Sequence, residues 1–567
     1  MTEDFRKTAP EPLAPVAFNI PQPFETALAN GLKVVVFEDR KLPLVSFRLF
    51  FRFGNINEPA DSTGLNSAVA SMLSEGTESY SSKQLAEEIE RLGAHLGASS
   101  GSDTTSISAS SLTLYASDIL RLMAEMILKP TFPEEELDLY RRNTVEHLKY
   151  QRSQPNFLAD EQISRIIYGT HPYSKVSPTA EDIENLTREK LVAHQARVYV
   201  PNNAVLIVVG DVDRDELIKE IEERFDEWEV GEIESFAFDK VPVRAERTLT
   251  IVDRKGSAQS NIVLANPAIE RHHEDYFRAL VMNQVLGAGA SSRIFMNLRE
   301  EKGYTYGAYS KFNMRRLAGE FEATAEVRTA VTGDSLKEFF YELNRIRDEK
   351  VSEEELQDAK NFLTGVFPIR AETQEGLTNL LVQQQIYDLP ADYLQTYRDR
   401  VNEITSEDVA AAANKYVQPE QMAIVIVGDA EEILAQSKDY AASVEIFDTE
   451  NNPQEASNYG KPAEAAAIDV SGEWDLKIDF QGQKFPVTLI LDQTDGNVSG
   501  KLDSMLGEGR IENGKVAGSG FSAIAALDAQ GQPYELSITG TVDNNEMNGT
   551  VSVPKFPTPL DFTGQKK

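Results

Sequence analysis

Two stretches decide the fold: LTREKLVAHQARVYVPNNAVLIVVGD (residues 186–211) and ITSEDVAAAANKYVQPEQMAIVIVGD (residues 404–429). Their polar and apolar positions follow the same order, and each ends in a Val-rich run that is followed by Gly-Asp. The second stretch lies 218 residues after the first. Similarity at so long a period indicates two homologous domains joined end to end.

Two further pairs of segments support the duplication. PEEELDLYRRN (residues 133–143) recurs as SEEELQDAKNF (residues 352–362), and VVFEDRK (residues 35–41) recurs as LTIVDRK (residues 249–255). All three pairs occur in the same order with nearly constant offset. We therefore expect the following division: a Pro-rich, extended leader at 1–23, paired domains at 24–230 and 245–446, and an inter-domain linker at 231–244.

Each paired domain is expected to mix strands and helices. In the first domain, Val45, Phe47 and Leu49 alternate with polar residues, which is typical of a strand with one buried face. An apolar helix is predicted at about 118–128, and the acidic start of the next helix follows Pro133. The predicted fold class is α+β, with two homologous α/β half-domains.

The composition changes after the second repeat. Residues 447–468 are polar and without periodicity, which is typical of a linker. Residues 469–567 contain short β-rich runs separated by Asn- and Gly-containing turns. We expect a small antiparallel β barrel or sandwich there, with Trp474 packed in its core.

The charge balance disfavours two classes of partner. The chain of 567 residues has 91 acidic and 56 basic side chains, a net charge of −35, which disfavours nucleic acid and anionic membranes. It has no cysteine, so zinc would need His, Asp or Glu ligands.

No apolar run reaches the ~20 residues of a membrane helix. The N-terminus has no apolar signal region, and the compartment stays open between cytoplasm and cell envelope, where a signal peptide would have been removed.

One helix carries a specific motif pattern. GLNSAVASMLSEGT (residues 64–77), followed by SSKQLAEEIERLGAHLGA (residues 81–98), resembles the signature segment of the insulinase and pitrilysin zinc metallopeptidases, which include the mitochondrial processing peptidases. Active members carry His-x-x-Glu-His, in which two imidazoles one helical turn apart hold zinc and the glutamate activates water.

In this chain the three motif positions hold Ser67, Ala70 and Ser71. Neutral hydroxyls are weak zinc ligands and alanine cannot accept a proton, so we expect no zinc and no catalysis by this chain alone. The family's further glutamate ligand would fall near Glu146. No two of the six histidines are four residues apart, and HHED (residues 272–275) is interpreted as structural.

A second family segment is intact. SSRIFMNLREEKGYTYGAYS (residues 291–310) resembles the sequence segment with which members of this family bind substrate. Arg299 and Tyr306 have the family's spacing. The resemblance implies that both face a zinc site across a chamber, where they stabilise charge on the scissile carbonyl. From residue types alone, Arg299 would be interpreted as a solvated helix charge and Tyr306 as a packed strand residue, and only the resemblance favours a functional role. Gly303 is expected to end the helix, which places Tyr306 on the following strand.

The resemblance implies a function in an assembly. In some members two homologous chains share one active site, one chain bringing zinc and the other the Arg and Tyr. We expect a non-catalytic, substrate-binding subunit of a heterodimeric zinc metallopeptidase, with a zinc-bearing homologous partner and peptide or unfolded polypeptide as substrate. The alternative is a proteolytically inactive peptide-binding or scaffold protein of the same fold. An enzyme with its own chemistry would need a metal site or nucleophile that the sequence does not reveal.

Overall fold

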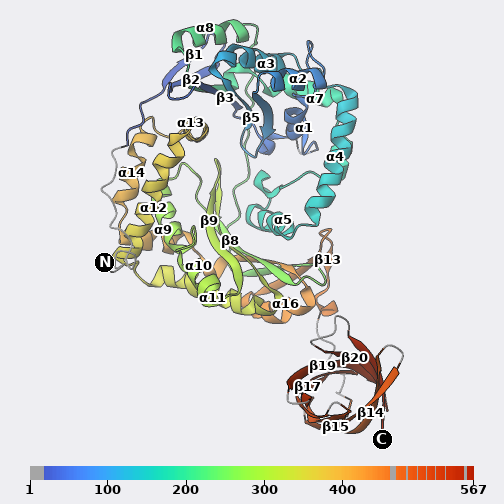
Figure 1. Cartoon of the computed structure of the whole chain (residues 1–567). Coiled ribbons are helices and arrows are strands. Elements are labelled where there is room, and N and C mark those ends of the chain that lie inside the picture. The colour runs from blue at the N-terminus through green and yellow to red at the C-terminus, as the bar shows by residue number, and fades with distance from the viewer. Residues whose placement is uncertain are drawn as a thin grey trace, which may run out of the picture. The chain divides into compact units, whose positions relative to one another are not determined.

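The chain forms two compact units, Met1–Asn458 and Tyr459–Lys567, as seen in a computed structural model (Figure 1). The structure describes residues 18–59, 61–459, 468–480, 483–494, 496–505, 507–517, 519–529, 532–543, 545–553 and 559–567. Most of the predicted leader and residues 460–467 of the predicted second linker therefore lie outside the described residues. Residues 231–244 contain neither helix nor strand.

The first unit contains two sheets of similar topology. The first sheet has the strand order β1-β2-β6-β3-β5-β4, and the second has the order β13-β12-β7-β11-β8-β10-β9. Strands β2, β6, β3, β5 and β4 correspond in order to β7, β11, β8, β10 and β9, which confirms the duplication at the level of topology. The strands are β1 Phe24–Ala27, β2 Lys33–Glu38, β3 Leu44–Phe51, β4 His95–Ser100, β5 Thr105–Leu112, β6 Ala204–Gly210, β7 Thr248–Asp253, β8 Gln259–Ala268, β9 Thr305–Met314, β10 Gly319–Arg328, β11 Ala423–Gly428, β12 Ser443–Asp448 and β13 Pro453–Gln454.

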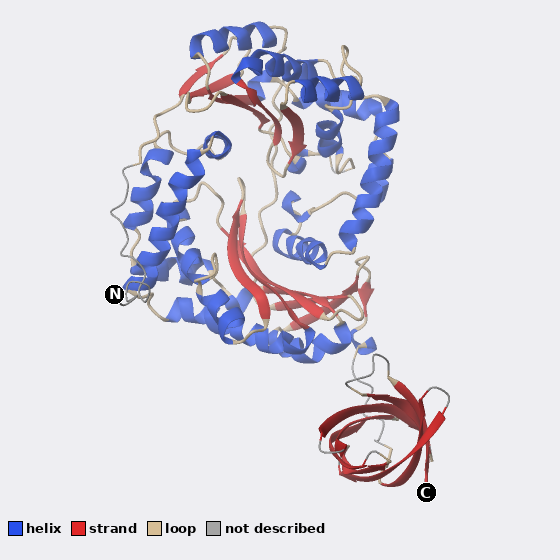
Figure 2. Cartoon of the chain, in the orientation of Figure 1, coloured by secondary structure: helices blue, strands red, loops and turns tan. Residues whose placement is uncertain are grey.

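Helices cover both sheets (Figure 2). The helices of the first half are α1 Leu65–Met72, α2 Ser82–Arg91, α3 Ala116–Leu128, α4 Glu134–Arg152, α5 Pro155–Tyr168, α6 Ala180–Glu184, α7 Arg188–Val198 and α8 Arg214–Phe225. Those of the second half are α9 Tyr276–Leu286, α10 Arg293–Phe295, the π-helical turn η6 Met296–Glu301, α11 Thr332–Asp348, α12 Glu353–Glu372, α13 Gln374–Ile386, α14 Tyr393–Glu403, α15 Ser406–Tyr416 and α16 Ala430–Ser437.

The two halves exchange one helix each. Helix α5 of the first half packs on β8 and β11 of the second sheet, whereas its counterpart α13 packs on β3 and β6 of the first sheet (Figure 1). Arg48 and Arg52 form ion pairs with Glu375 and Asp388, both 2.6 Å long. The exchange makes each half part of the core of the other.

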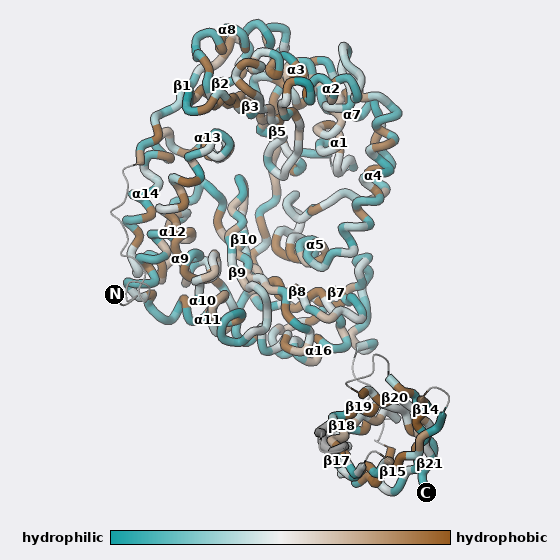
Figure 3. The backbone as a smooth tube through the Cα atoms, viewed as in Figure 1, coloured by the Kyte–Doolittle hydropathy of each residue, from teal (hydrophilic) through white to brown (hydrophobic). Residues whose placement is uncertain are grey.

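The exchange also corrects the predicted burial of the first central strand. We expected β3 to bury one face, but Ser46 and Phe50 on its opposite face are buried too. Helix α13 lies on that face, so both faces of the strand are covered. Figure 3 shows hydrophobic residues along the strands of both sheets.

The second unit is a closed, antiparallel, eight-stranded barrel, one of the two predicted forms. Trp474 is fully buried in it, as predicted, and its indole N–H donates to the Val470 carbonyl over 2.8 Å. The strands are β14 Gly472–Phe480, β15 Gln483–Thr494, β16 Asn497–Ser504, β17 Gly507–Ala517, β18 Gly520–Ala529, β19 Gln532–Asp543, β20 Glu546–Ser552 and β21 Leu560–Lys566.

The first residues of the predicted second linker are structured. Residues 447–448 continue β12, which pairs with β7, and β13 adds to the same sheet. The polar composition of this segment hid a short edge strand, because its side chains are largely exposed. The boundary between the two units accordingly falls after Asn458.

Candidate functional site

The three degenerate motif positions lie on α1. The helix begins after Gly64, whose φ of +88° is in the left-handed region that favours glycine. Ser67 and Ser71 lie one helical turn apart, and the Ser67 hydroxyl donates to Asn55 Oδ1 over 3.5 Å. Ala70 is buried in the core. The helix therefore presents two hydroxyl groups and a methyl group where a zinc enzyme needs two imidazoles and a carboxylate.

A buried carboxyl group satisfies the start of α1. Glu58 accepts hydrogen bonds from the backbone N–H groups of Gly64 at 2.9 Å and Asn66 at 2.6 Å. These amides have no partner within the helix, so the carboxyl acts as a cap. Burial raises the pKa of Glu58 to about 7, against the opposing effect of these two hydrogen bonds.

Helix α4 places the phenol of Tyr140 beside the motif residue Ser71 on α1. Burial raises the pKa of Tyr140, whose hydroxyl shares hydrogen bonds with Thr144 and with Ser71 of the motif. Glu146, where the family's further zinc ligand was expected, has a side chain 71% exposed and pairs with Lys149 over 2.6 Å. The position nearest that ligand in sequence thus lies on the outer face of α4, and a tyrosine contacts α1 instead.

Ser67 opens on a small pocket shared by the two halves. The pocket has a volume of about 170 Å³, and Glu58, Lys175 and Arg315 are among the residues that line it. Arg315 comes from the turn between β9 and β10, and its guanidinium lies 4.7 Å from the ring centre of Tyr173.

Backbone contacts hold this turn against the first half. The Arg316 N–H donates to Asp103 Oδ2 over 3.2 Å, and Asp103 belongs to the equivalent turn between β4 and β5. Sequence reasoning did not select Arg315. The only signal was two consecutive arginines shortly after the predicted strand that carries Tyr306, and this signal matches no family motif.

Arg299 and Tyr306 are held together at the start of β9. The Nε of Arg299, on η6, donates to the Tyr306 carbonyl oxygen over 3.1 Å. Gly303, with φ of +63°, ends the helical turn, and Tyr306 lies on the following strand as predicted. The Tyr306 side chain is 91% exposed.

The Arg299 guanidinium also pairs with Glu300 and lies 5.3 Å from the ring centre of Phe295. In the described part of the chain, these polar contacts keep Arg299 within the second half rather than beside α1. Arg299 thus contacts the backbone of Tyr306, and the phenol is exposed to solvent.

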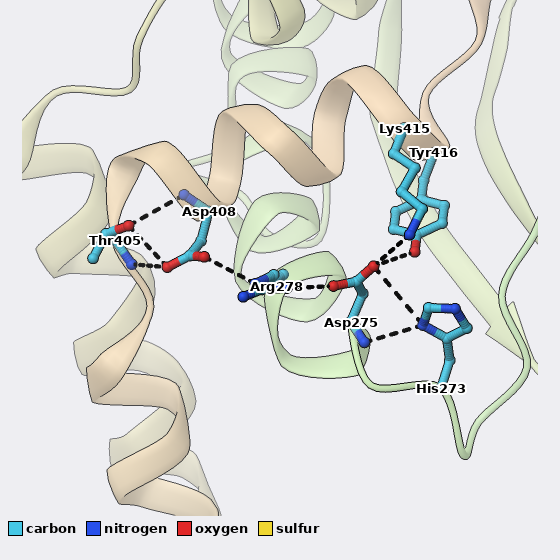
Figure 4. Close-up of polar contacts among 7 residues, drawn as sticks. All are labelled: His273, Asp275, Arg278, Thr405, Asp408, Lys415 and Tyr416. Carbon is cyan, nitrogen blue, oxygen red and sulfur yellow. Dashed lines mark hydrogen bonds and ion pairs between the residues drawn. The ribbon is translucent and has the colours of Figure 1, made fainter.

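The HHED segment is a structural junction (Figure 4). His273 Nδ1 accepts from the Asp275 N–H over 3.0 Å. The Asp275 carboxylate receives hydrogen bonds from Arg278 and from Lys415 and Tyr416 at the end of α15. Burial by itself would raise the pKa of Asp275, but these donors outweigh it and hold the pKa well below its ordinary value. The segment thus joins α9 to α15, as the structural interpretation predicted.

The other histidines do not gather into a metal site either. Burial lowers the pKa of His194 to about 4, and its Nε2 lies 3.3 Å from Asn66 Oδ1. Across the residues that the structure describes, no three side chains of the metal-binding types come together. Within the same residues, no helix combines the length and apolar character needed to cross a membrane.

Comparison with known families gives two adjacent matches. Residues 33–177 match the family model described as Insulinase (Peptidase family M16), and residues 185–363 match the model described as Peptidase M16 inactive domain. The barrel lies outside both matches.

Similar proteins and structures agree with this assignment. An uncharacterized zinc protease, YmxG of Bacillus subtilis, is 24% identical over 68% of this chain and 96% of its own length. The non-peptidase homolog YmxG of Helicobacter pylori is 23% identical over 70% of this chain and 93% of its own. A crystal structure of a peptidase M16 inactive domain from Pseudomonas fluorescens is 29% identical, with a TM-score of 0.67 over 72% of this chain and 98% of its own.

The two family matches follow one another along the duplicated halves, and the degenerate helix lies within the first. The chain belongs to the insulinase family of peptidases, family M16, as a member whose motif positions hold no zinc ligand.

Proposed function

We propose that this chain is the non-catalytic, substrate-binding subunit of a heterodimeric zinc metallopeptidase. In this proposal the zinc and the general base lie on a homologous partner chain. This chain contributes Arg299 and Tyr306 to the shared active site and helps to hold a peptide or unfolded polypeptide. By itself it cleaves nothing.

One observation carries the proposal: the chain has lost the zinc ligands but keeps an exposed phenol. A tyrosine that is 91% exposed on a strand contributes little to its own fold, because its ring buries almost no surface. Arg299 nevertheless fixes the backbone at this residue through the Tyr306 carbonyl. Such an arrangement suits a hydrogen-bond donor that acts on a group outside the chain.

The edges of the sheets suit an extended substrate. Strands β4 and β9 are the equivalent edge strands of the two sheets, and Tyr306 lies on β9. An edge strand offers backbone N–H and C=O groups that an extended peptide can pair with. Binding through the backbone would accept many sequences, as a processing or degradative peptidase requires.

The relatives support both parts of the proposed complex. Some relatives of this chain are named zinc proteases, and one is named a non-peptidase homolog. The proposal thus needs a partner of the kind that is named a zinc protease, and it places this chain with the kind that is named a non-peptidase homolog.

The alternative is an inactive peptide-binding or scaffold protein. The pocket at Ser67 favours this alternative, because it offers a binding site that needs no catalysis. Both halves line the pocket, and Lys175 and Arg315 are among its residues. A scaffold would bind peptide unaided and would not need the Tyr306 phenol, so the two functions give different results in one experiment.

The experiment is reconstitution with a zinc-bearing homologue that carries His-x-x-Glu-His. We expect peptidase activity from the mixture that neither chain has alone. Tyr306→Phe should lower turnover about 100- to 1000-fold while leaving assembly intact, because it removes one donor to the developing oxyanion. Arg299→Ala should also weaken peptide binding, since a guanidinium can orient substrate carbonyls.

Tyr341→Phe is the matched control, because this tyrosine is 53% exposed on α11 of the same half. It should leave turnover unchanged. Equal turnover in the Tyr306→Phe, Arg299→Ala and control complexes would refute a catalytic contribution, and peptide binding by this chain without a partner would then favour the scaffold.

A further inference from the structure

The inward-facing side chains of the C-terminal barrel are more deeply buried at one end of the strands than at the other. On β14 the inward-facing side chains include Trp474, which is fully buried, and Ile478, which is half-buried. The antiparallel register places Trp474 opposite Leu489 and Ile478 opposite Phe485 on β15. Burial therefore falls from the Trp474 end of the barrel toward the other end.

The Trp474 end is closed and tightly packed. Val470, just before the first strand, is fully buried and accepts the hydrogen bond from the Trp474 indole. Leu489, which lies opposite Trp474, and Leu491 are also fully buried, and neither of them lines the cavity described next. The side chains of this end therefore pack against one another.

The opposite end contains an apolar cavity of about 710 Å³. Leu502, Leu527, Leu536 and Ile538 are among the side chains that line it, and Met505 lies at its rim, 73% exposed. Among the described residues of the lining, the polar side chains are Ser504 and Tyr534, and none is charged.

A cavity of this size is not a packing defect. Protein interiors contain few voids larger than a water molecule, and the closed end of this same barrel meets that standard. Small-molecule sites, in contrast, measure about 300–1,000 Å³ and are mostly apolar. An eight-stranded barrel is wide enough to hold one small ligand in its interior.

We propose that the barrel binds one neutral, single-chain lipid, with the hydrocarbon chain in the cavity and the polar head at the rim beside Met505. The apolar wall suits a hydrocarbon chain, whose burial releases water from both surfaces. A folded protein cannot enter a space enclosed by eight paired strands. This site is independent of the proposed peptidase function.

The charge of the barrel selects the head group. Residues 468–567 contain fourteen acidic and eight basic side chains. No charged side chain among the described lining residues is available to pair with an ionised head. An anionic head would meet a field of its own sign, so a fatty alcohol should bind more tightly than the fatty acid of equal chain length.

The test is a displacement titration on the full-length chain. N-phenyl-1-naphthylamine, a neutral apolar fluorophore, should bind and be displaced by octanol, nonanol and decanol, with affinity rising about fourfold per added methylene. Decanoate should displace it less well than decanol. Failure of the fluorophore to bind, or an affinity that does not depend on chain length, would overturn the proposal.

Cavity-filling variants locate the site. Leu536→Trp should lower fluorophore affinity roughly tenfold or more, because the indole occupies space that the ligand needs. Ile524→Trp is the control, since Ile524 is 44% exposed on the outside of the same barrel. Ile478→Trp, on another wall of the cavity, serves if thermal unfolding shows that Leu536→Trp is not folded. Equal affinity in the control and in a folded cavity variant would place the site elsewhere and refute the proposal.

Discussion

Glu58 makes the stability of the first half depend on pH. Its pKa is about 7 in the folded chain, raised from 4.5 by burial. Below about pH 4.5 both folded and unfolded states are protonated. As the pH rises toward 7, the unfolded chain ionises first, so the free energy of unfolding decreases across this window and levels off above it.

Replacing Glu58 with Gln should remove this dependence. The amide still offers an oxygen to the N–H groups of Gly64 and Asn66, but it does not ionise. The difference in unfolding free energy, variant minus parent, should increase by up to about 3 kcal/mol between pH 4.5 and 7. Thermal unfolding at a series of pH values measures it, with the exposed Glu146→Gln as control. Parallel pH profiles for parent and Glu58→Gln would show that Glu58 titrates normally.

At the residue scale, the sequence predicted the loss of the zinc ligands but not the contacts that surround the motif positions in this structure. The absence of zinc ligands at Ser67, Ala70 and Ser71 follows from the motif alone. The buried cap from Glu58 and the contact of Tyr140 with Ser71 do not, because they depend on which face of α4 meets α1. Arg315 was equally hidden, since the approach of two turns from different halves places it at the pocket.

At the scale of elements, the exchange of α5 and α13 should make the two halves one cooperative unit. Leu381 is fully buried on α13. We expect Leu381→Ala to lower the free energy of unfolding by about 2–5 kcal/mol, through lost burial and a residual cavity.

Hydrogen exchange would show which strands are destabilised in Leu381→Ala. Amides of β3 and β6 in the first half should exchange faster in Leu381→Ala, because α13 covers these strands. Gln383→Ala, at an exposed position of the same helix, should leave them unchanged. Faster exchange confined to the second half would show that the exchanged helix does not stabilise the first sheet.

Local patterns predicted several elements but not this exchange. The apolar helix near 118–128 and the acidic start at Glu134 have local signals, and both appear as α3 and α4. The second cover of β3 comes from a helix more than 300 residues away, as the Arg48–Glu375 pair shows. An alternating strand sequence cannot reveal whether its polar face meets water or a distant helix.

At the scale of the whole molecule, the two units should unfold separately. The boundary after Asn458 and the separate hydrophobic core around Trp474 indicate independent folding. Calorimetry should show two transitions, and limited proteolysis between Asn458 and Ile468 should release a barrel fragment that retains its own transition. A single transition, with no stable fragment, would contradict this division.

The exchange of helices has a consequence for synthesis on the ribosome. The first sheet is complete when Gly210 has emerged, but the helix that covers its second face ends at Ile386. At ~5–20 residues per second, roughly 10–35 seconds of translation separate the two events. During that interval the uncovered face, with Phe50 on it, is exposed to other nascent chains and to chaperones. The order of the elements along the chain thus sets a period of vulnerability that ends only when α13 arrives.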